Sequence, residues 1–120
     1  MRVRIPVATV ALTVLAFVVV LYASVRLYTV HGDSMEPTVS SGQIVLVNRL
    51  AFVTRPPRTG DVVVVEHPLH PGALVVKRLA GAQDGRFFLR GDNPSHSIDS
   101  RHYGTVPESR IHGRVVFIGP

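Results

Sequence analysis

The sequence predicts a mainly β fold: a small folded β-sheet or barrel domain preceded by an N-terminal transmembrane helix. Residues 7–25 are nineteen residues without a charge. At about 1.5 Å per residue a helix of this length spans about 28 Å, close to the ~30 Å of a bilayer's hydrocarbon core. Residues 26–120 instead hold short valine-rich runs broken by glycine and proline, which is typical of strands and turns. The chain of 120 residues has room for one such domain and not two.

The apolar segment has the flanks of a membrane anchor. Pro6 stands at its start, where the missing N–H costs a helix nothing. Arg2 and Arg4 precede it, so the positive-inside tendency makes residues 1–6 a cytoplasmic tail and residues 26–120 an extracytoplasmic domain at the plasma membrane. A cleaved signal peptide is the alternative, although its apolar stretch is usually about 7 to 15 residues long.

Six apolar runs of strand length are expected to form the sheet. Each is rich in β-branched or aromatic residues, and turn-forming Gly, Pro, Asn and Asp separate them. Short strands at this spacing favour a small all-β barrel or folded sheet. Apart from the anchor, we expect one helical turn beginning at Ser34. The expected strands are 27–31, 43–48, 61–66, 73–79, 86–90 and 110–118.

The composition excludes several classes of function. The chain has no cysteine, which removes disulfides, thiolate catalysis and cysteine-based metal sites. Its net charge of +5 is spread along the chain without a basic patch interleaved with aromatic residues, so no nucleic-acid partner is expected. Attraction to anionic lipid headgroups is the simpler explanation of the excess charge. His67 and His70 flank a proline, which disfavours a helical metal pair, and no metal or other cofactor is expected.

Residues 31–38, with the sequence HGDSMEPT, are the first candidate catalytic segment. Gly32 can adopt backbone conformations denied to other residues, so the chain can turn sharply beside Ser34, and Pro37 stiffens the exit. A serine on such a turn can present its Oγ to a substrate, with nearby N–H groups facing an oxyanion. An ordinary serine-rich turn is the alternative. The chain has no Gly-x-Ser-x-Gly elbow, and none of its six histidines lies in a recognisable triad context.

Lys77 is the second candidate, because it lies on the apolar face of an expected strand. With a period of two it shares that face with Val75 and Leu79, while Arg78 points to the opposite, wetter face. Burial lowers the pKa of a lysine because the charged form is desolvated. A neutral amine can take the proton of a serine hydroxyl, which makes Ser–Lys an alternative to Ser–His. A lysine at a sheet edge whose ammonium reaches solvent is the alternative.

Residues 91–107 form the densest polar stretch of the chain. Asp99 and Arg101 fall on one side of an extended chain and could pair. Ser97 and Ser100 offer uncharged hydroxyls, which could hold a neutral lysine in place without restoring its proton. A solvated loop is the alternative.

Taken in order, these segments resemble those of the type I signal peptidases, the Ser–Lys leader peptidases. The resemblance runs from about Val30 to Val116, and it is to a short member with a single anchor and no large insertion between Lys77 and Gly91. The lysine segment has Leu-Ala where Val-Ile or Val-Val is usual. The matching segments are SMEPT at 34–38, GDVVV at 60–64, KRLAG at 77–81, and GDN at 91–93 followed by SIDSR at 97–101, YG at 103–104 and VP at 106–107.

The resemblance implies catalytic roles for several of these residues. Ser34 would be the acylated nucleophile and Lys77 the general base of a membrane-anchored serine endopeptidase. The backbone N–H of Ser34 would be one oxyanion donor. Some family members supply the second donor with a hydroxyl two residues before the nucleophile, but this position is Gly32, so a backbone group or a water would have to serve. Ser97 would orient the lysine amine. Structural support for the surrounding loop would come from Asp99 and Arg101.

The resemblance also implies the substrates. Asp92 and Asn93 would support the site, while Met35, Val30 and Pro37 would contact the substrate. The family cuts leader peptides after small residues at the first and third positions before the bond. The expected partners are therefore exported preproteins and the lipid bilayer. A preprotein would bind as an added strand at a sheet edge. The oligomeric state stays open.

Two features place the expected site close to the membrane. Only eight residues separate Val25 from Ser34, and fully extended they reach no more than about 30 Å. The segment Leu50–Val53, followed by basic residues, could enter the membrane interface. A buried core segment is the alternative.

Three other functions stay open. A dedicated maturation protease for one substrate, like that of nickel-type superoxide dismutase, is also similar. A self-cleaving protease of the LexA-repressor type shares the chemistry, but the anchor and the lack of a DNA-binding domain argue against it. A non-catalytic anchored β-domain would bind exported peptides whether or not Ser34 is present.

Overall fold

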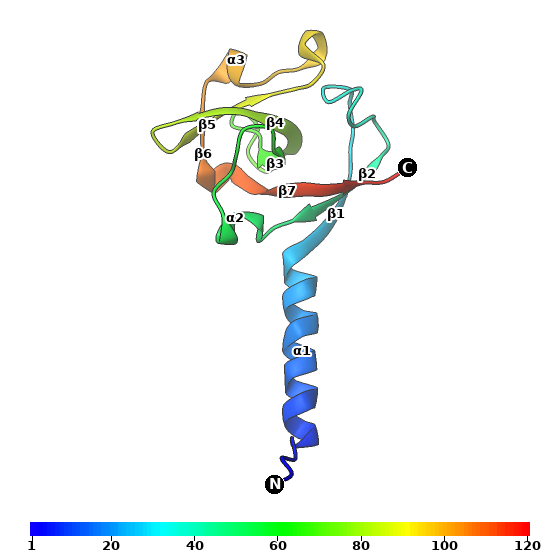
Figure 1. The fold of residues 1–120 in the computed structure, drawn as a ribbon. Helices are drawn as coiled ribbons and strands as arrows, with labels where there is room; N and C mark the ends of the chain where they lie inside the picture. Colours follow the sequence, from blue (N-terminus) through cyan, green and yellow to red (C-terminus); the bar gives the residue numbers. More distant parts are fainter.

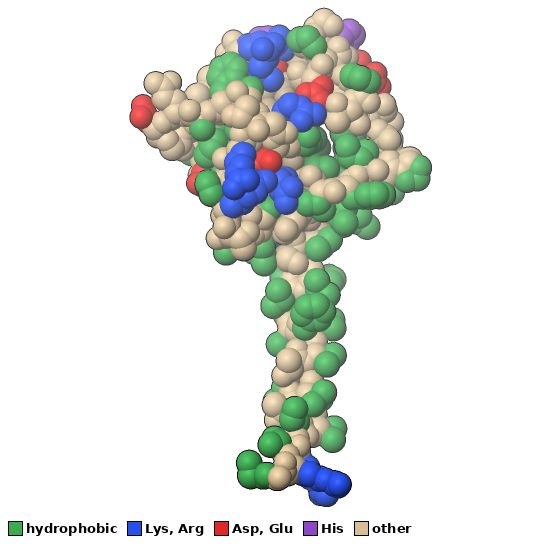
Figure 2. Space-filling view, in the orientation of Figure 1, with side chains coloured by type: hydrophobic (Ala, Val, Ile, Leu, Met, Phe, Trp, Pro, Cys, Tyr) green, Lys and Arg blue, Asp and Glu red, His purple; other side chains and the backbone are tan.

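A long N-terminal helix leads into a curled seven-stranded sheet (Figure 1). The structure is a computed structural model that describes residues 1–120. Helix α1 spans Val7–Ser24, ends one residue earlier than expected, and passes directly into β1, Val25–Thr29. None of its side chains is buried, and its mean hydropathy of 2.4 over 18 residues is that of a membrane span, although a signal sequence would show the same values. Figure 2 shows hydrophobic side chains along the helix and Lys or Arg at its N-terminal end.

The sheet confirms the expectation of a mainly β domain. All six strand pairings are antiparallel, and the strands lie in the order β1-β2-β7-β3-β4-β5-β6. The other strands are β2 Ile44–Asn48, β3 Val62–Glu66, β4 Leu74–Gln83, β5 Arg86–Arg90, β6 Val106–Pro107 and β7 Ile111–Ile118. Single turns of helix form α2 Ala51–Thr54, η1 Pro94–His96, α3 Ser100–Tyr103 and η2 Glu108–Arg110.

Three strands differ from the expected pattern. Strand β1 begins and ends two residues before the expected 27–31, because Val25 to Thr29 are the residues that pair with β2. Strand β4 continues to Gln83, four residues beyond the expected end, because a bulge between Leu79 and Gly81 lets it go on pairing with β5 after β3 has ended. Strand β6 was not expected, and its two residues pair with the start of β5. The expected turn at Ser34 is present as a hydrogen-bonded turn and not as a helix, and the N–H of Val39 donates to the carbonyl of Met35 within it. The short helices α2, η1, α3 and η2 were not expected.

The core lies on both faces of β3. Val63 and Val65 belong to one cluster, while Val64 belongs to a second cluster on the opposite face, because successive side chains of a strand alternate. The second cluster includes Met35, which is 1% exposed. The turn that carries Ser34 is therefore fixed to the sheet by burial of its neighbour.

The segment Leu50–Val53 divides between the two alternatives that its sequence left open. Ala51 is buried and Phe52 packs against the first core cluster, whereas Leu50 and Val53 are 44% and 77% exposed. The short helix α2 is thus held by one face and presents two apolar side chains to its surroundings.

Candidate active site

The Ser34 turn is tied to the segment that follows β5. Gly32 has φ +90°, a conformation that favours glycine, and it reverses the chain just before Ser34. The N–H of Asn93 donates to the carbonyl of Ser34 at 2.9 Å, and the Asn93 side-chain amide donates to the carbonyl of Asp33 at 3.0 Å. These bonds join residues about sixty positions apart in the chain and hold Ser34 against the polar segment, residues 91–107.

Gly91 lies between Ser34 and Ser97 with no room for a side chain. A Cβ at this position would be 2.2 Å from Ser97 Oγ and 2.6 Å from the carbonyl oxygen of Ser34. These two atoms are therefore no farther apart than the sum of those distances. The packing brings the Ser34 turn and the Ser97 hydroxyl together around one glycine.

Lys77 enters the same region from β4. Its side chain is 3% exposed, and its Nζ donates to Ser97 Oγ at 3.0 Å. Burial lowers the pKa of Lys77, and although the charge of Asp99 acts in the opposite direction, the net direction is downward. Its strand face is apolar as expected, because Leu79 is buried on it and Val75 packs on the core. Lys77 is also the chain's one lysine.

Asp99 fixes the hydroxyl that holds the lysine. Ser97 Oγ donates to Asp99 Oδ2 at 2.9 Å, and the N–H of Gly91 donates to the same oxygen at 2.9 Å. The Arg101 guanidinium donates to both carboxylate oxygens, at 2.9 and 3.0 Å. Burial alone would raise the pKa of Asp99, but these donors hold it well below its usual range. The carboxylate is therefore ionised, and the Ser97 proton points to it and leaves an oxygen lone pair for Lys77.

A second ion pair, formed by Arg78 next to Lys77 on β4, stabilises the segments around the site. Arg78 donates from Nε and Nη2 to the two carboxylate oxygens of Asp92, each at 2.8 Å. Asp92 also accepts a hydrogen bond from the hydroxyl of Thr38, at the end of the Ser34 turn. The contact joins β4, the segment after β5 and the Ser34 turn.

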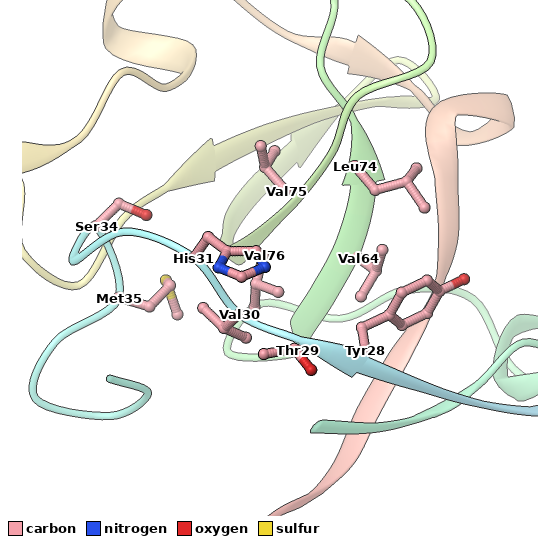
Figure 3. A pocket seen from close by; sticks show the side chains of 10 residues that line it. All are labelled: Tyr28, Thr29, Val30, His31, Ser34, Met35, Val64, Leu74, Val75 and Val76. Carbon is pink, nitrogen blue, oxygen red and sulfur yellow. The ribbon is translucent and has the colours of Figure 1, made fainter. Parts of the chain in front are cut away.

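An apolar cavity of about 140 Å³ opens beside Ser34 (Figure 3). Its wall is formed by the end of β1 with the residues that follow it, the middle of β3 and the start of β4, and these elements bring mostly apolar side chains. Ser34 provides one of the few hydroxyl groups on this wall. The lining residues are Tyr28, Thr29, Val30, His31, Ser34, Met35, Val64, Leu74, Val75 and Val76.

The arrangement agrees with a sequence comparison that covers nearly the whole chain. A family model described as signal peptidase, peptidase S26, matches residues 3–84 and 82–119. The chain belongs to the S26 signal peptidase family.

Several relatives carry names that fit this family. Mitochondrial inner membrane protease subunit 1 of Schizosaccharomyces pombe is 34% identical over 94% of this chain and 84% of its own length. The mouse protein of that name is 31% identical over 72% of this chain, and signal peptidase I of Aquifex aeolicus is 33% identical over 59%. The chain spans 64% of the mouse protein and 28% of the Aquifex protein.

The S26 chain brings most of its candidate residues together, with informative exceptions. Ser34 Oγ makes no hydrogen bond to Lys77 or to any histidine, so the two candidate catalytic residues are linked through Ser97 and the packing around Gly91. Pro37 is exposed and does not line the cavity, whereas Val30 and Met35 do.

The N–H of Gly32, the position of the second oxyanion donor in some family members, is already engaged. It donates to the Ser41 hydroxyl at 3.2 Å. The structure also contains no group of three His, Cys, Asp or Glu side chains placed to hold a metal ion.

Sequence reasoning missed two parts of the site. Gly91 was recognised only as part of a matching segment, and its packing between two serines depends on contacts that no local pattern reveals. His31 lines the cavity next to Ser34. Its position three residues before Ser34 in the sequence could have indicated that it lies near the cavity, but the side chain of a histidine in a turn is usually solvated.

Proposed function

We propose that this chain is a membrane-anchored serine endopeptidase that removes leader peptides from exported preproteins, with Ser34 as nucleophile and Lys77 as general base. One observation carries the proposal. The chain's one lysine is buried, hydrogen-bonded to a serine hydroxyl, and packed beside the turn of a second serine that opens onto an apolar cavity. Burial at this position disfavours the charged form of Lys77 more than the charge of Asp99 favours it, so the site suits a neutral amine.

The proposed reaction begins with Lys77 in its neutral form. As Ser34 Oγ attacks the carbonyl carbon of the scissile bond, its proton passes to Lys77 Nζ. The resulting ammonium gives this proton to the departing amine, which leaves an acyl-enzyme on Ser34. Water then attacks the ester carbonyl carbon, and Lys77 takes the water's proton and returns it to Ser34 Oγ as the ester C–O bond breaks. The leader peptide leaves with a new C-terminal carboxyl group, and Lys77 is again neutral. In the unliganded enzyme the hydrogen bond between nucleophile and base is often long, and substrate binding brings the two together.

The Ser97–Asp99 pair keeps the Lys77 amine in one orientation. Because the Ser97 proton is bound to an ionised carboxylate, the hydroxyl accepts an N–H from Lys77 and leaves the nitrogen lone pair free for Ser34. The backbone N–H of Ser34 is the proposed first oxyanion donor. The second donor would have to be a water or the Gly32 N–H released from Ser41.

The cavity supports binding of an apolar part of the substrate. Its apolar wall and volume of about 140 Å³ suit an apolar side chain of a substrate that lies along the neighbouring strands. From the resemblance to the signal peptidases we further propose small residues at the first and third positions before the cut.

We propose that α1 anchors the enzyme, with the residues before it cytoplasmic and residues 26–120 on the outer side of the plasma membrane. The names of the eukaryotic relatives make the mitochondrial inner membrane the second candidate location. Protease added to right-side-out vesicles should digest the domain after α1 and spare the N-terminal tail. Protection of the whole chain would contradict this orientation.

The test is cleavage of a preprotein by the full chain in detergent, with the new N-terminus sequenced. Ser34→Ala and Lys77→Ala should each lower kcat by at least about 10⁴-fold, because members of a catalytic unit fail together. Lys77→Arg should fail equally, since a guanidinium keeps its proton. Ser109→Ala, an exposed serine on η2, is the matched control and should cleave normally.

The outcomes separate the competing functions. Cleavage that survives Ser34→Ala or Lys77→Ala would refute the Ser–Lys proposal, and loss of activity in His31→Ala alone would assign the base to the histidine in the cavity. Peptide binding without new termini would indicate a non-catalytic domain. Processing of one preprotein from a varied panel would indicate a dedicated maturation protease.

A further inference from the structure

The loop after β2 is attached to the end of the proposed membrane anchor. The N–H of Arg49 donates to the carbonyl of Ser24, the last residue of α1, at 2.6 Å. Asn48 lies opposite Val25 in the β1–β2 pairing. The loop and the helix α2 that follows it are therefore held at the level where α1 leaves the domain (Figure 1).

Arginines outnumber acidic residues around this loop, and Asp61 compensates only some of them. Arg114 on β7 pairs in register with Asn48, next to Arg49. Arg55 forms an ion pair with Asp61, and the N–H of Arg58 donates to the same carboxylate. Figure 2 shows Lys or Arg side chains gathered around an acidic one in this part of the domain, near the emerging helix.

Two of these arginines keep their charge unpaired. The side chains of Arg49 and Arg58 are exposed and form no ion pair. Arg114 differs from them, because it lies close enough to Asp61 for its charge to favour the ionised carboxylate, and its Nε is buried. Leu50 and Val53 are exposed beside the two unpaired arginines, while Ala51 and Phe52 hold the helix to the core. Unpaired guanidinium groups around exposed apolar side chains are the composition that binds the interface of an acidic bilayer.

We propose that Arg49 and Arg58, together with Leu50 and Val53, form a docking surface for acidic phospholipid headgroups, which we call the α2 surface. The arginines contact phosphate groups, and the two apolar side chains enter the interface. Docking orients the domain on the bilayer from which its substrate emerges. This inference rests on the proposed anchoring of α1 in a membrane.

The chain has no tryptophan, so a single introduced tryptophan reports the position of one residue. Full-length Val53→Trp is reconstituted in vesicles of phosphatidylcholine and phosphatidylglycerol whose acyl chains carry bromine. We expect its fluorescence to fall about twofold or more, as suits a side chain within ~5–10 Å of the acyl boundary. Ser95→Trp, in η1 at the end of the domain farthest from α1, is the matched control and should keep its fluorescence (Figure 1).

Charge variants test the headgroup contact. Each arginine near an acidic surface contributes about fivefold to binding, so Arg49→Ala with Arg58→Ala should lower the ratio of docked to undocked protein by about 25-fold. The control removes two arginines from β5, Arg86→Ala with Arg90→Ala, and should leave the quenching unchanged. High salt or vesicles of phosphatidylcholine alone should also reduce the quenching.

Three results would overturn the proposal. They are an unquenched Val53→Trp in acidic vesicles, equal quenching in vesicles without acidic lipid, and a blue-shifted but unquenched emission, which would mean that protein covers the surface. Extraction with alkaline carbonate tests the α1 anchor separately, because an unanchored chain would leave the vesicles. Cleavage by Val53→Trp in detergent tests the chemistry and the fold, so a failed docking cannot be mistaken for a failed enzyme.

Discussion

Gly91→Ala should disable the proposed site by adding one methyl group. The new Cβ would lie 2.2 Å from Ser97 Oγ, 2.5 Å from Ser97 Cβ and 2.6 Å from the carbonyl oxygen of Ser34. Non-bonded carbon atoms are in best contact at about 3.5–4.0 Å, so each of these distances is too short by roughly 1 Å or more. The atoms that must move belong to the residue that holds Lys77 and to the backbone of the proposed nucleophile.

The size of the effect follows from this displacement. Overpacking of a filled core site usually costs about 1–3 kcal/mol in the free energy of unfolding. A shift of about 1 Å between reacting groups can cost about 100-fold in rate. We therefore expect Gly91→Ala to fold with reduced stability and to lose about 100-fold in kcat/KM for preprotein cleavage.

The control is Gly81→Ala on β4. Neither Gly81 nor Gly91 has a positive φ, so alanine suits both backbones, but a Cβ at Gly81 meets nothing within 4 Å. This variant should match the parent or gain about 0.4–1 kcal/mol. Both variants are measured by urea unfolding and by cleavage in detergent. If Gly91→Ala cleaves as fast as Gly81→Ala, the packing of the two serines around this glycine does not set the catalytic geometry, and the reasoning is wrong.

Three further predictions follow from the same contacts. Ser97→Ala should lower kcat about tenfold, because it removes one hydrogen bond that orients Lys77. KM should change little, because no substrate contact is lost. An unchanged kcat would show that Ser97 does not orient Lys77. The pKa of Lys77 is lower in the folded protein, so the unfolded chain binds more protons and the free energy of unfolding should rise with pH toward 10.5. Lys77→Met should flatten this rise in urea midpoints measured below pH 10. Above that pH the raised pKa of Tyr103, about 12 in the folded protein, makes stability fall with pH and opposes the effect of Lys77. A rise that persists in Lys77→Met would have another source. Asp92→Asn should lower the free energy of unfolding in urea by about 1–2 kcal/mol, because it breaks the two hydrogen bonds of the ion pair with the partly exposed Arg78. An unchanged midpoint of urea unfolding would show that solvent already screens this ion pair.

Local patterns were sufficient to predict most of the strands and the burial of Lys77. Strand periodicity decides which side chains share a face, and the structure places Lys77 with Leu79 on the covered face of β4. The helix α1 was equally predictable, because its length and lack of charge need no tertiary context. The extension of β4 and the short β6 were not, since both depend on pairing with β5.

The polar segment shows why the details of the site were harder to predict. Asp99 and Arg101 were expected to pair on an extended chain, and they do pair, but Asp99 is the N-cap of α3 and accepts the N–H of Arg101 as well as its guanidinium. The same carboxylate accepts the N–H of Gly91 and the hydroxyl of Ser97. Such convergence on one buried group depends on how distant segments fold together, which a linear pattern does not encode.

The proposed chemistry depends on the protonation of one amine. Because the chain has a single lysine, a sample labelled with ¹³C-lysine gives one side-chain signal, and its chemical shift can be titrated by NMR in detergent. We expect Lys77 to titrate below the ordinary lysine value of 10.5, at the same pH at which kcat/KM for preprotein cleavage rises. A titration at or above 10.5, or a kcat/KM profile whose rise does not coincide with it, would contradict Lys77 as the general base.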